Sequence, residues 1–445
     1  MNQLRGPVPD RRTPPAGQLP RLISRGTPLG LRAHVERYGP PPASGGRRHG
    51  GAPQLIASVE RAGLTGRGGA GFPTARKMRA VAGGRGRSGP PVVVANGVES
   101  EPASGKDAIL LSHSPHLVLD GIAAAAAAVG ASEAYLCVDD SHPQRAGRLS
   151  AAIADRADAG MGEVPVQLVA FPHRYVASEE SALVNFLNGG SALPVFVPPR
   201  PFARGVGGRP TLVNNVETLA HLALIARYGP DWFCSVGTQA APGSALVTIS
   251  GAVRRPGVYE AALGTRLGDL IALAGGAAEP PQAILSGGYF GSWLPLPAAV
   301  DVPASHPGLR SAGGAFGAGV LIVLPASACG IAETARVFRY LAGQSAGQCG
   351  PCRYGLPDIS RALDHVAWQG GDERADAWMR ELLPLVKGRG ACRFPDGAVA
   401  LVASALQVFG ADLENHLRYG PCPRVGRPPV LPVPGEPQPS RPGSR

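Results

Sequence analysis

The chain has 445 residues, 44% of them apolar, and a mean hydropathy near zero, which suits about two to four folded domains. Its formal net charge of +11 comes almost entirely from the two ends, because residues 1–50 and 421–445 together hold thirteen arginines and three acidic residues. The body is therefore nearly neutral, and no stacking aromatic residues are interleaved with the terminal arginines, so we expect no nucleic-acid binding.

Both ends are rich in Pro, Gly and Arg, a composition that buries too little apolar surface to offset the entropy lost on ordering. We expect residues 1–50 and 421–445 to be disordered tails, except for a short helix around LRAHVERYG. The longest apolar run, 121–131, is too short to cross a bilayer, and the N-terminus lacks an apolar signal sequence. We expect a cytoplasmic protein without direct membrane insertion.

The first motif in chain order, GLTGRGGAGFPTARKM, is a glycine-rich loop followed by a helical sequence. Glycines have no Cβ, so the backbone N–H groups of the loop can closely approach a phosphate or a flavin. The N-terminus of the following helix would add a favourable dipole for an anion. A tight turn without a ligand is the alternative interpretation of this loop.

The second motif, PPVVVANGVESEPASGKD, begins with a β-branched run that predicts a buried parallel strand. Ligands of open α/β sheets bind just past the carboxyl ends of strands, where this chain has Asn96, Glu99, Glu101 and Lys106. The carboxylates are suited to accept hydrogen bonds from ribose hydroxyls or a carboxamide.

Two further polar clusters precede predicted helices. Glu179 and Glu180 are favoured at a helix start by the helix dipole alone. N-capping accounts for one of Asn214 and Asn215, but not for a tandem pair with Glu217 two residues later.

The remainder of the chain predicts two more folding units. Residues 244–276 alternate apolar and polar residues across a turn and then enter an amphipathic helix, the element order of a β-grasp domain. Four helical sequences joined by short Gly-bearing loops then predict a bundle: residues 331–343, 356–369, 372–388 and 397–420.

The sequence SAGQCGPCRYG, with Cys349 and Cys352, is followed by Cys392. Cysteines at this spacing in a cytoplasmic chain favour metal or cluster ligands over disulfides, and an iron–sulfur cluster takes four ligands. Cys137 and Cys234 lie among apolar neighbours, so we expect them to be buried packing residues.

The motifs GRGGAGFPT, ANGVESEP with GKD, SEESAL and PTLVNNVETLA together resemble the NADH-binding flavoprotein subunit of respiratory complex I, which is the F subunit of NADH-quinone oxidoreductase. The resemblance implies a Rossmann-like α/β domain that binds FMN and NADH over residues 51–240. It further implies a β-grasp (SLBB-like) domain over 241–328 and a C-terminal four-helix bundle carrying a cluster over 329–420.

The resemblance also implies the cofactor-binding residues. The glycine loop and its lysine would hold FMN, the acidic strand end would hold flavin and NADH, the Asn pair would contact FMN, and one retained aromatic residue would stack on the nucleotide. On this chain the positions are Gly66, Arg67, Gly68, Gly69, Phe72, Lys77, Asn96, Glu99, Glu101, Glu179, Glu180, Asn214 and Asn215.

The chain departs from the family pattern at the cluster. Ala346 stands where the family has its first cysteine, and alanine offers no donor atom. We expect Cys422 to be the fourth ligand beside Cys349, Cys352 and Cys392 of a 4Fe-4S cluster. The alternatives are an oxygen from Ser345, the thiolate of Cys329, a cluster with three cysteines, and a structural zinc ion on the three loop cysteines and Cys422.

The nucleotide site departs as well. Val98 stands where the family has Asp, Ala80 where it stacks a second aromatic residue, and Met78 where it has Trp. Losing a hydrogen bond to a charged group costs roughly 1.5–3 kcal/mol and losing a stacked ring about 0.5–1.5 kcal/mol, so FMN binding is better supported than NADH binding.

The expected function is that of an NADH dehydrogenase-type flavoprotein oxidoreductase. Electrons would pass from NADH through FMN to the cluster and on to a ferredoxin-like protein or another redox partner subunit. The alternatives are a cluster-binding electron-transfer or assembly subunit that no longer oxidises NADH, and a zinc-stabilised scaffold. A place on the periphery of a membrane redox complex is compatible with either electron-transfer function.

Overall fold

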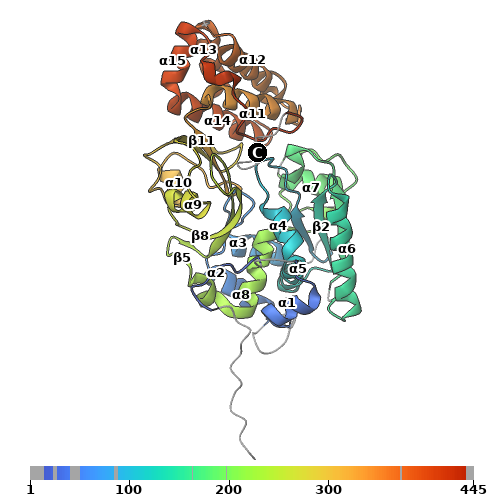
Figure 1. The fold of residues 1–445 in the computed structure, drawn as a ribbon. Coiled ribbons are helices and arrows are strands. Elements are labelled where there is room, and N and C mark those ends of the chain that lie inside the picture. Colours follow the sequence, from blue (N-terminus) through green and yellow to red (C-terminus); the bar gives the residue numbers. More distant parts are fainter. Residues whose placement is uncertain are drawn as a thin grey trace, which may run out of the picture.

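The computed structural model describes residues 15–23, 28–40, 51–84, 89–162, 164–196, 198–370 and 373–436. Figure 1 shows an α/β domain, a β-grasp domain beside it, and a helical domain at one end of the molecule. The fold class predicted from the sequence is confirmed in this order of domains.

The α/β domain is built on a parallel four-stranded sheet with the strand order β3-β2-β1-β4. Its central strand β1 is the predicted apolar run, and Val92 to Ala95 are buried on both faces, as a strand covered by helices on two sides requires. The strands are β1 Val92–Gly97, β2 Glu133–Asp139, β3 Val166–Phe171 and β4 Thr211–Asn215. The helices are α2 Gly51–Arg61, α3 Thr74–Gly83, α4 Lys106–His113, α5 Pro115–Val129, α6 Pro143–Asp158, α7 Glu180–Leu187 and α8 Val216–Cys234.

Helices α5 and α8 form the tightest contact between helices in this domain. A Cβ atom on Gly121 of α5 would lie 2.0 Å from the carbonyl oxygen of Leu219 in α8. Only glycine permits this approach. The alanine-rich run that the sequence marks as its longest apolar stretch is therefore a core helix.

Part of the N-terminal segment is ordered, so the expectation of a disordered tail was wrong for residues 15–23 and for the residues of 28–40 that flank the predicted short helix. The other residues of 1–50 lie outside those described. The expected short helix is α1 (Leu31–Tyr38). Its His34 contacts the buried carboxylate of Asp120 at 2.7 Å, and Leu22 and Tyr38 join the apolar core. Burial of these few side chains offsets the ordering cost that the composition suggested.

The β-grasp domain contains a mixed five-stranded sheet with the order β10-β9-β11-β7-β8. The predicted hairpin and helix are β7, β8 and α9. The bounds are β7 Ser244–Gly251, β8 Gly257–Ala262, α9 Leu267–Leu273, β9 Pro281–Ser286, β10 Ser292–Pro295, α10 His306–Ser311 and β11 Val320–Pro325; a small ribbon, β5 Gly237–Thr238 with β6 Ala241–Pro242, precedes them.

The helical domain differs from the predicted bundle in its last helix. The expected single helix over 397–420 is broken at Phe409 into two helices bent by 79°. The Phe409 ring packs 5.2 Å from that of Trp293 and fills the space beside Gly330, where a Cβ would lie 2.4 Å from it. The helices are α11 Gly330–Gln344, α12 Leu356–Trp368, α13 Glu373–Val386, α14 Phe394–Val408 and α15 Gly410–Tyr419.

The segment after α15 is ordered through Glu436, so the expected disorder over 421–445 was wrong for 421–436, and residues 437–445 lie outside those described. Leu431 and Val433 are 0% and 2% exposed. The carboxylate of Glu333 in α11 accepts hydrogen bonds from the backbone N–H groups of Val430 and Leu431. Two buried apolar side chains and a buried carboxylate thus hold this proline-rich segment in place, although residues 421–436 form no β-strand.

Among the described residues, no single helix is long and apolar enough to cross a membrane. Two bent pairs, α4 with α5 and α14 with α15, meet that requirement of length and composition only when their helices are taken together.

Candidate functional site

The carboxyl edge of the parallel sheet brings the predicted motifs together. Asn96 at the end of β1 pairs in register with Asn215 at the end of β4. The glycine loop lies over this edge, since the Arg67 N–H donates to the Thr218 hydroxyl at 2.8 Å and a Cβ on Gly68 would lie 3.3 Å from the Asn215 Cβ. Motifs that are far apart in the sequence therefore form one surface.

Lys106 holds these strand ends in place. Its Nζ is buried and lies 2.7 Å from Asp107, 3.0 Å from Glu217 and 3.2 Å from the Asn215 Oδ1. Burial opposes the charged amine, but the Asp107 and Glu217 carboxylates outweigh burial and raise the pKa of Lys106 above its usual value. Lys106 is thus an internal cation that orients the Asn215 amide.

Lys77 reaches the same edge from helix α3. Its Nζ donates to the Val213 carbonyl at 3.0 Å and lies 3.4 Å from both carboxylate oxygens of Glu180. The Lys77 side chain is 20% exposed, so its ammonium is partly accessible to solvent at this edge.

Arg67 does not contribute its side chain to this surface. The guanidinium is buried and donates to Thr65 and, at 3.1 Å, to the Ser244 carbonyl of the β-grasp domain. Burial lowers the pKa of Arg67, and the charge of Glu217 partly opposes that effect. The buried guanidinium links the glycine loop to the β-grasp domain, so Arg67 could contribute to the predicted cofactor site only through its backbone.

The acidic residues of the strand end are held by the protein. Glu99 accepts hydrogen bonds from the backbone N–H groups of Asp107 and Ala108 and so caps helix α4. Glu101 accepts from the Tyr175 hydroxyl and the Tyr289 N–H, both at 2.8 Å. Burial raises the pKa of Glu101 to about 7.

A pocket of about 350 Å³ adjoins these carboxylates. It lies past the carboxyl ends of β1 and β2, where the sheet topology favours ligand binding. The C-terminal segment forms one wall of it. Its lining includes Glu99, Glu101, Asp139, His142, Arg145, His173, Pro432 and Pro434.

The residues at the loop and strand ends fit a flavin. The Asn214 Nδ2 is buried, and within the described part of the chain it has no hydrogen-bond partner. A buried donor of this kind requires an acceptor, which a carbonyl or phosphate oxygen of FMN would supply. Phe72 is 45% exposed, with the Arg76 guanidinium 5.8 Å from its ring, and is available for stacking.

The structure also explains the departures from the family pattern. Val98 is buried in the apolar cluster on one face of the sheet, which has no place for a carboxylate. Ala80 is exposed, and its methyl group cannot supply the second stacking ring that the family has at this position of the helix. Met78 is buried in the core beneath helix α3.

Three of the four predicted cluster ligands converge. Cys349, Cys352 and Cys392 line one small cavity together with Ala346, so the position that lacks a thiol faces the same space as the three that carry one. The loop Pro194–Val195, which follows α7, closes this cavity. Burial, and then the neighbouring Cys349, raise the pKa of Cys352 to about 12.

Cys422 lies elsewhere, which corrects the expectation that it completes this set. Its sulfur lies within 4.8 Å of the ligand atoms of Cys329 and His416. The break at Phe409 turns α15 back toward the start of α11 and carries Cys422 to that end. The sequence suggests Cys329 only as an alternative cluster ligand and does not single out His416, although a His and a Cys six positions apart are a usable signal.

An aromatic cluster connects the pocket to the cysteine loop. The Tyr175 ring, whose hydroxyl bonds Glu101, lies 4.8 Å from Phe290 and 5.8 Å from Phe394, two residues after Cys392. Glu179 caps α7 and its charge is among those that raise the pKa of Cys392, after burial. The sheet edge and the cysteine loop are therefore adjacent parts of one site. Cys137 is buried as expected, but Cys234 is exposed.

Comparison with known families matches three parts of the chain. Residues 59–224 match the Nuo51 FMN-binding domain, 246–288 the SLBB domain, and 332–416 the iron-sulfur binding region of NADH-ubiquinone oxidoreductase-F. The last match contains the three converging cysteines and ends before Cys422.

Whole-chain relatives are similar over most of their length. The F subunit of NADH-quinone oxidoreductase from Streptomyces coelicolor is 33% identical over 380 residues, covering 83% of this chain and 84% of the relative. The corresponding F 2 subunit of Rhizobium meliloti is 31% identical, covering 83% and 90%. A crystal structure of an NAD+-reducing [NiFe]-hydrogenase in the air-oxidized state aligns with a TM-score of 0.78 and 29% identity over 88% of this chain, which spans 65% of that hydrogenase chain.

Proposed function

The chain belongs to the family of the NADH-quinone oxidoreductase F subunits, and from this premise we propose that it oxidises NADH at a bound FMN and passes the electrons to an iron–sulfur cluster. When bound, FMN would accept hydride from NADH and release electrons singly. The observation that carries the proposal is the aromatic contact of Tyr175 with Phe394, because it joins the flavin-binding sheet edge to the cysteine loop.

In this proposal the backbone of Gly66, Gly68 and Gly69 approaches the flavin, and Lys77 neutralises its phosphate. The unpartnered amide of Asn214 donates to the flavin, and Asn96 and Asn215 shape the edge on which it lies. Glu180 orients Lys77. These side chains bind and position, and the buried sheet edge excludes water.

The nucleotide would enter by the pocket beside Glu99 and Glu101 and stack on Phe72. Glu101, whose pKa is raised to about 7 by burial, holds a proton over part of the physiological pH range and can donate to a carboxamide oxygen. Glu179 would remain the cap of α7 beside the cluster.

The cluster would be held by Cys349, Cys352 and Cys392, with no protein thiolate on the side of Ala346. Ala346 supplies no donor atom, so the fourth ligand of the cluster would have to come from solvent. The exposed Tyr354, two residues after Cys352, would lie on the face from which a ferredoxin-like protein or partner subunit takes electrons. That face would be used at the periphery of a multi-subunit redox complex, as the names of the relatives imply.

The test is a visible spectrum of the full chain after anaerobic reconstitution with iron, sulfide and FMN, recorded before and after NADH. We expect a flavin band that NADH bleaches and a broad cluster absorption that the triple variant Cys349→Ser, Cys352→Ser, Cys392→Ser lacks. Asn214→Leu, of similar size but without the amide, should lose FMN and keep the cluster.

A protein that stays colourless would refute the proposal. A flavin band that dithionite bleaches and NADH does not would instead support an electron-transfer subunit that no longer oxidises NADH, the alternative favoured by buried Val98 and by Ala80.

A further inference from the structure

A second group of potential metal ligands lies at the junction of α11, α15 and the C-terminal segment. The Cys329 Sγ, a ring nitrogen of His416 and the Cys422 Sγ all lie within 4.8 Å of one another. Cys329 and His416 are 2% and 0% exposed, and the Cys329 Sγ is 3.6 Å from the His416 Nε2. None of the three lines the pocket beside Glu99 and Glu101 or the cavity of Cys349, Cys352 and Cys392.

The imidazole is already oriented as a metal ligand would be. The His416 Nδ1 lies 3.2 Å from the Val366 carbonyl, and a carbonyl can only accept, so Nδ1 carries the proton and Nε2 presents its lone pair to the two sulfurs. A backbone carbonyl on the outer nitrogen is the usual partner of a metal-bound histidine. The Cys422 N–H donates to Nε2 at 3.2 Å, and a bound metal would replace this contact.

Burial raises the pKa of the Cys329 thiol to about 12, so a bound metal would have to displace its proton, but polar groups that would stabilise a metal-bound thiolate lie at both sulfurs. Cys329 is the N-cap of α11, and the backbone N–H groups of Ile331 and Ala332 point at its sulfur. The Arg424 guanidinium contacts the Cys422 sulfur and is held at 2.6 Å by Asp412. Two thiolates and a neutral imidazole would balance the charge of a divalent ion, with the two thiol protons released to solvent.

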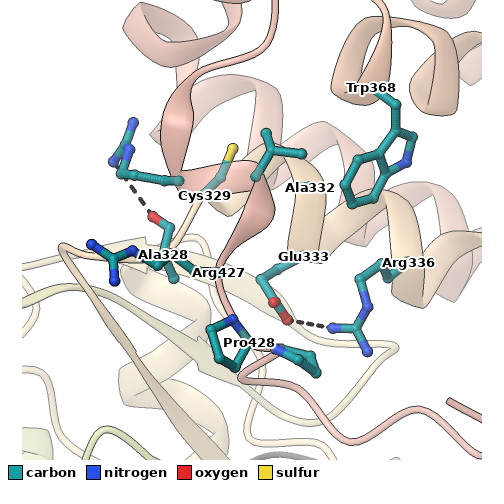
Figure 2. Close-up of a pocket in the computed structure, with 11 residues that line it drawn as sticks. Ala328, Cys329, Ala332, Glu333, Arg336, Trp368, Arg427 and Pro428 are labelled. Carbon is teal, nitrogen blue, oxygen red and sulfur yellow. Dashed lines mark hydrogen bonds and ion pairs between the residues drawn. The ribbon is translucent and has the colours of Figure 1, made fainter. Parts of the chain in front are cut away.

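A cavity of about 70 Å³ adjoins the group, and Figure 2 shows Cys329 and Ala332 at the start of α11 on its wall. It is large enough for a water molecule. The Glu333 carboxylate on the same wall is paired with Arg336 and with the backbone of Val430 and Leu431, so it is not a ligand. The protein therefore offers three ligands, and a fourth would come from solvent.

We propose that Cys329, His416 and Cys422 bind one Zn²⁺ ion, which fastens the C-terminal segment to the start of helix α11. Zinc accepts two thiolates and an imidazole in tetrahedral geometry, with water at the fourth position. The proposal is independent of the flavin site and of the cluster, because it shares no ligand with either.

The experiment uses the full chain without an affinity tag, loaded with Zn²⁺ and freed of excess metal by gel filtration. In the triple variant Cys349→Ser, Cys352→Ser, Cys392→Ser we expect about one zinc ion per chain by mass spectrometry. Adding Cys422→Ser, a partly exposed position, should remove that ion, whereas adding Cys234→Ser, an exposed cysteine at the end of α8, should retain it.

Cobalt gives a second measurement on the same proteins. Co²⁺ should produce sulfur-to-metal charge-transfer absorption in the triple variant and in its Cys234→Ser derivative, and lose it in the Cys422→Ser derivative. Circular dichroism reports folding; if the triple variant does not fold, the unaltered chain and its single Cys422→Ser variant are compared instead.

Zinc that is retained after Cys422→Ser, or a chain that binds no zinc while it is folded and its thiols are reduced, would overturn the proposal. So would a Cys329–Cys422 disulfide as the main form in protein kept under the reducing conditions of the loading experiment.

Discussion

At the scale of the residue, Ala346 determines what kind of cluster the chain can hold. It faces the cavity of Cys349, Cys352 and Cys392, so a thiol at this position would reach the missing corner. We expect Ala346→Cys to raise the iron retained per reconstituted chain and to slow loss of cluster absorption in air, because a fourth thiolate replaces an exchangeable ligand. Iron analysis and the decay of the spectrum measure both effects.

Two control variants accompany this prediction. Ser345→Ala should leave iron content unchanged if the serine oxygen is not a ligand, and Cys422→Ser should leave it unchanged because Cys422 lies with Cys329 and His416. A loss of cluster iron in Cys422→Ser would contradict this separation of the cysteines into two groups.

Glu101 gives the site a pH dependence. Burial raises its pKa to about 7, above the ordinary value of 4.5, so folding favours its protonated form. Its contribution to stability is complete below about pH 4.5 and is lost as the pH rises through 7. Between pH 5 and pH 8, we expect the free energy of unfolding of Glu101→Gln to rise by roughly 2 kcal/mol relative to that of the unaltered apoprotein. Urea unfolding at the two pH values measures this difference.

The exposed carboxylate of Glu414 provides the comparison for this experiment. Glu414→Gln should show the same pH dependence as the unaltered chain. Equal pH dependence in Glu101→Gln and the unaltered chain would mean that Glu101 is already ionised in the folded state.

The sequence predicted which side chains lie together where a loop or a strand end restricts them. Cys349 and Cys352 share a short loop, and Asn96 and Asn215 lie at the ends of adjacent parallel strands, so local patterns brought them together. The burial of the Arg67 side chain and the position of Cys422 were missed because their partners come from distant segments of the chain. The Ser244 carbonyl and the Cys329 thiol that they meet are about 180 and 90 positions away, beyond any motif.

At the scale of the element, helix α1 depends on one buried carboxylate. Asp120 in α5 contacts His34 of α1 at 2.7 Å, Arg156 of α6 at 2.8 Å and Arg227 of α8 at 2.6 Å. Burial would raise the pKa of Asp120, but these partners lower it to about 2. Its stabilisation is therefore present above the ordinary value of 3.8 and is lost as the pH falls through 2.

Replacing Asp120 should loosen four helices at once. We expect Asp120→Asn to cost about 3–5 kcal/mol at pH 7, since it leaves buried guanidinium groups without their counter-charge. Denaturant unfolding measures the cost, and proteolysis near α1 should become faster. Asp301→Asn, at an exposed ion pair with Arg266, should change stability by less than about 1 kcal/mol.

Periodicity predicted the existence of the elements better than their ends. The apolar spacing over 397–420 suits one continuous helix, and the only local sign of a break is Gly410, directly after Phe409. The break depends on the room beside Gly330 and on the ring of Trp293, which belong to other elements. The sequence predicts helix α1 but not what fixes it, because Asp120 supplies a partner that the N-terminal segment itself does not contain.

At the scale of the whole molecule, the C-terminal segment joins the three domains. Its backbone donates a hydrogen bond to Glu333 of the helical domain, and its Pro432 carbonyl accepts one from the Tyr289 hydroxyl of the β-grasp domain. Pro432 and Pro434 line the same pocket as Glu99 and Glu101 of the α/β domain.

Removing residues 430–445 should therefore destabilise more than a tail would. Leu431 and Val433 are buried, so we expect the free energy of unfolding of the helical domain to fall by roughly 3–6 kcal/mol. Thermal or urea denaturation measures this loss. Removing only 437–445 is the matched control and should change stability little. Equal stability of the two shortened chains would show that the docked segment contributes nothing.

Docking of residues 421–436 also couples sites that share no residue. If nucleotide binds more tightly when Pro432 and Pro434 are in place, the bound nucleotide must favour docking by the same factor, because linkage is reciprocal. An ion at Cys329 and Cys422 would act on that same equilibrium from the other end of the segment. Metal supply and nucleotide affinity would then be correlated in this chain, through a proline-rich segment that forms no part of the electron path.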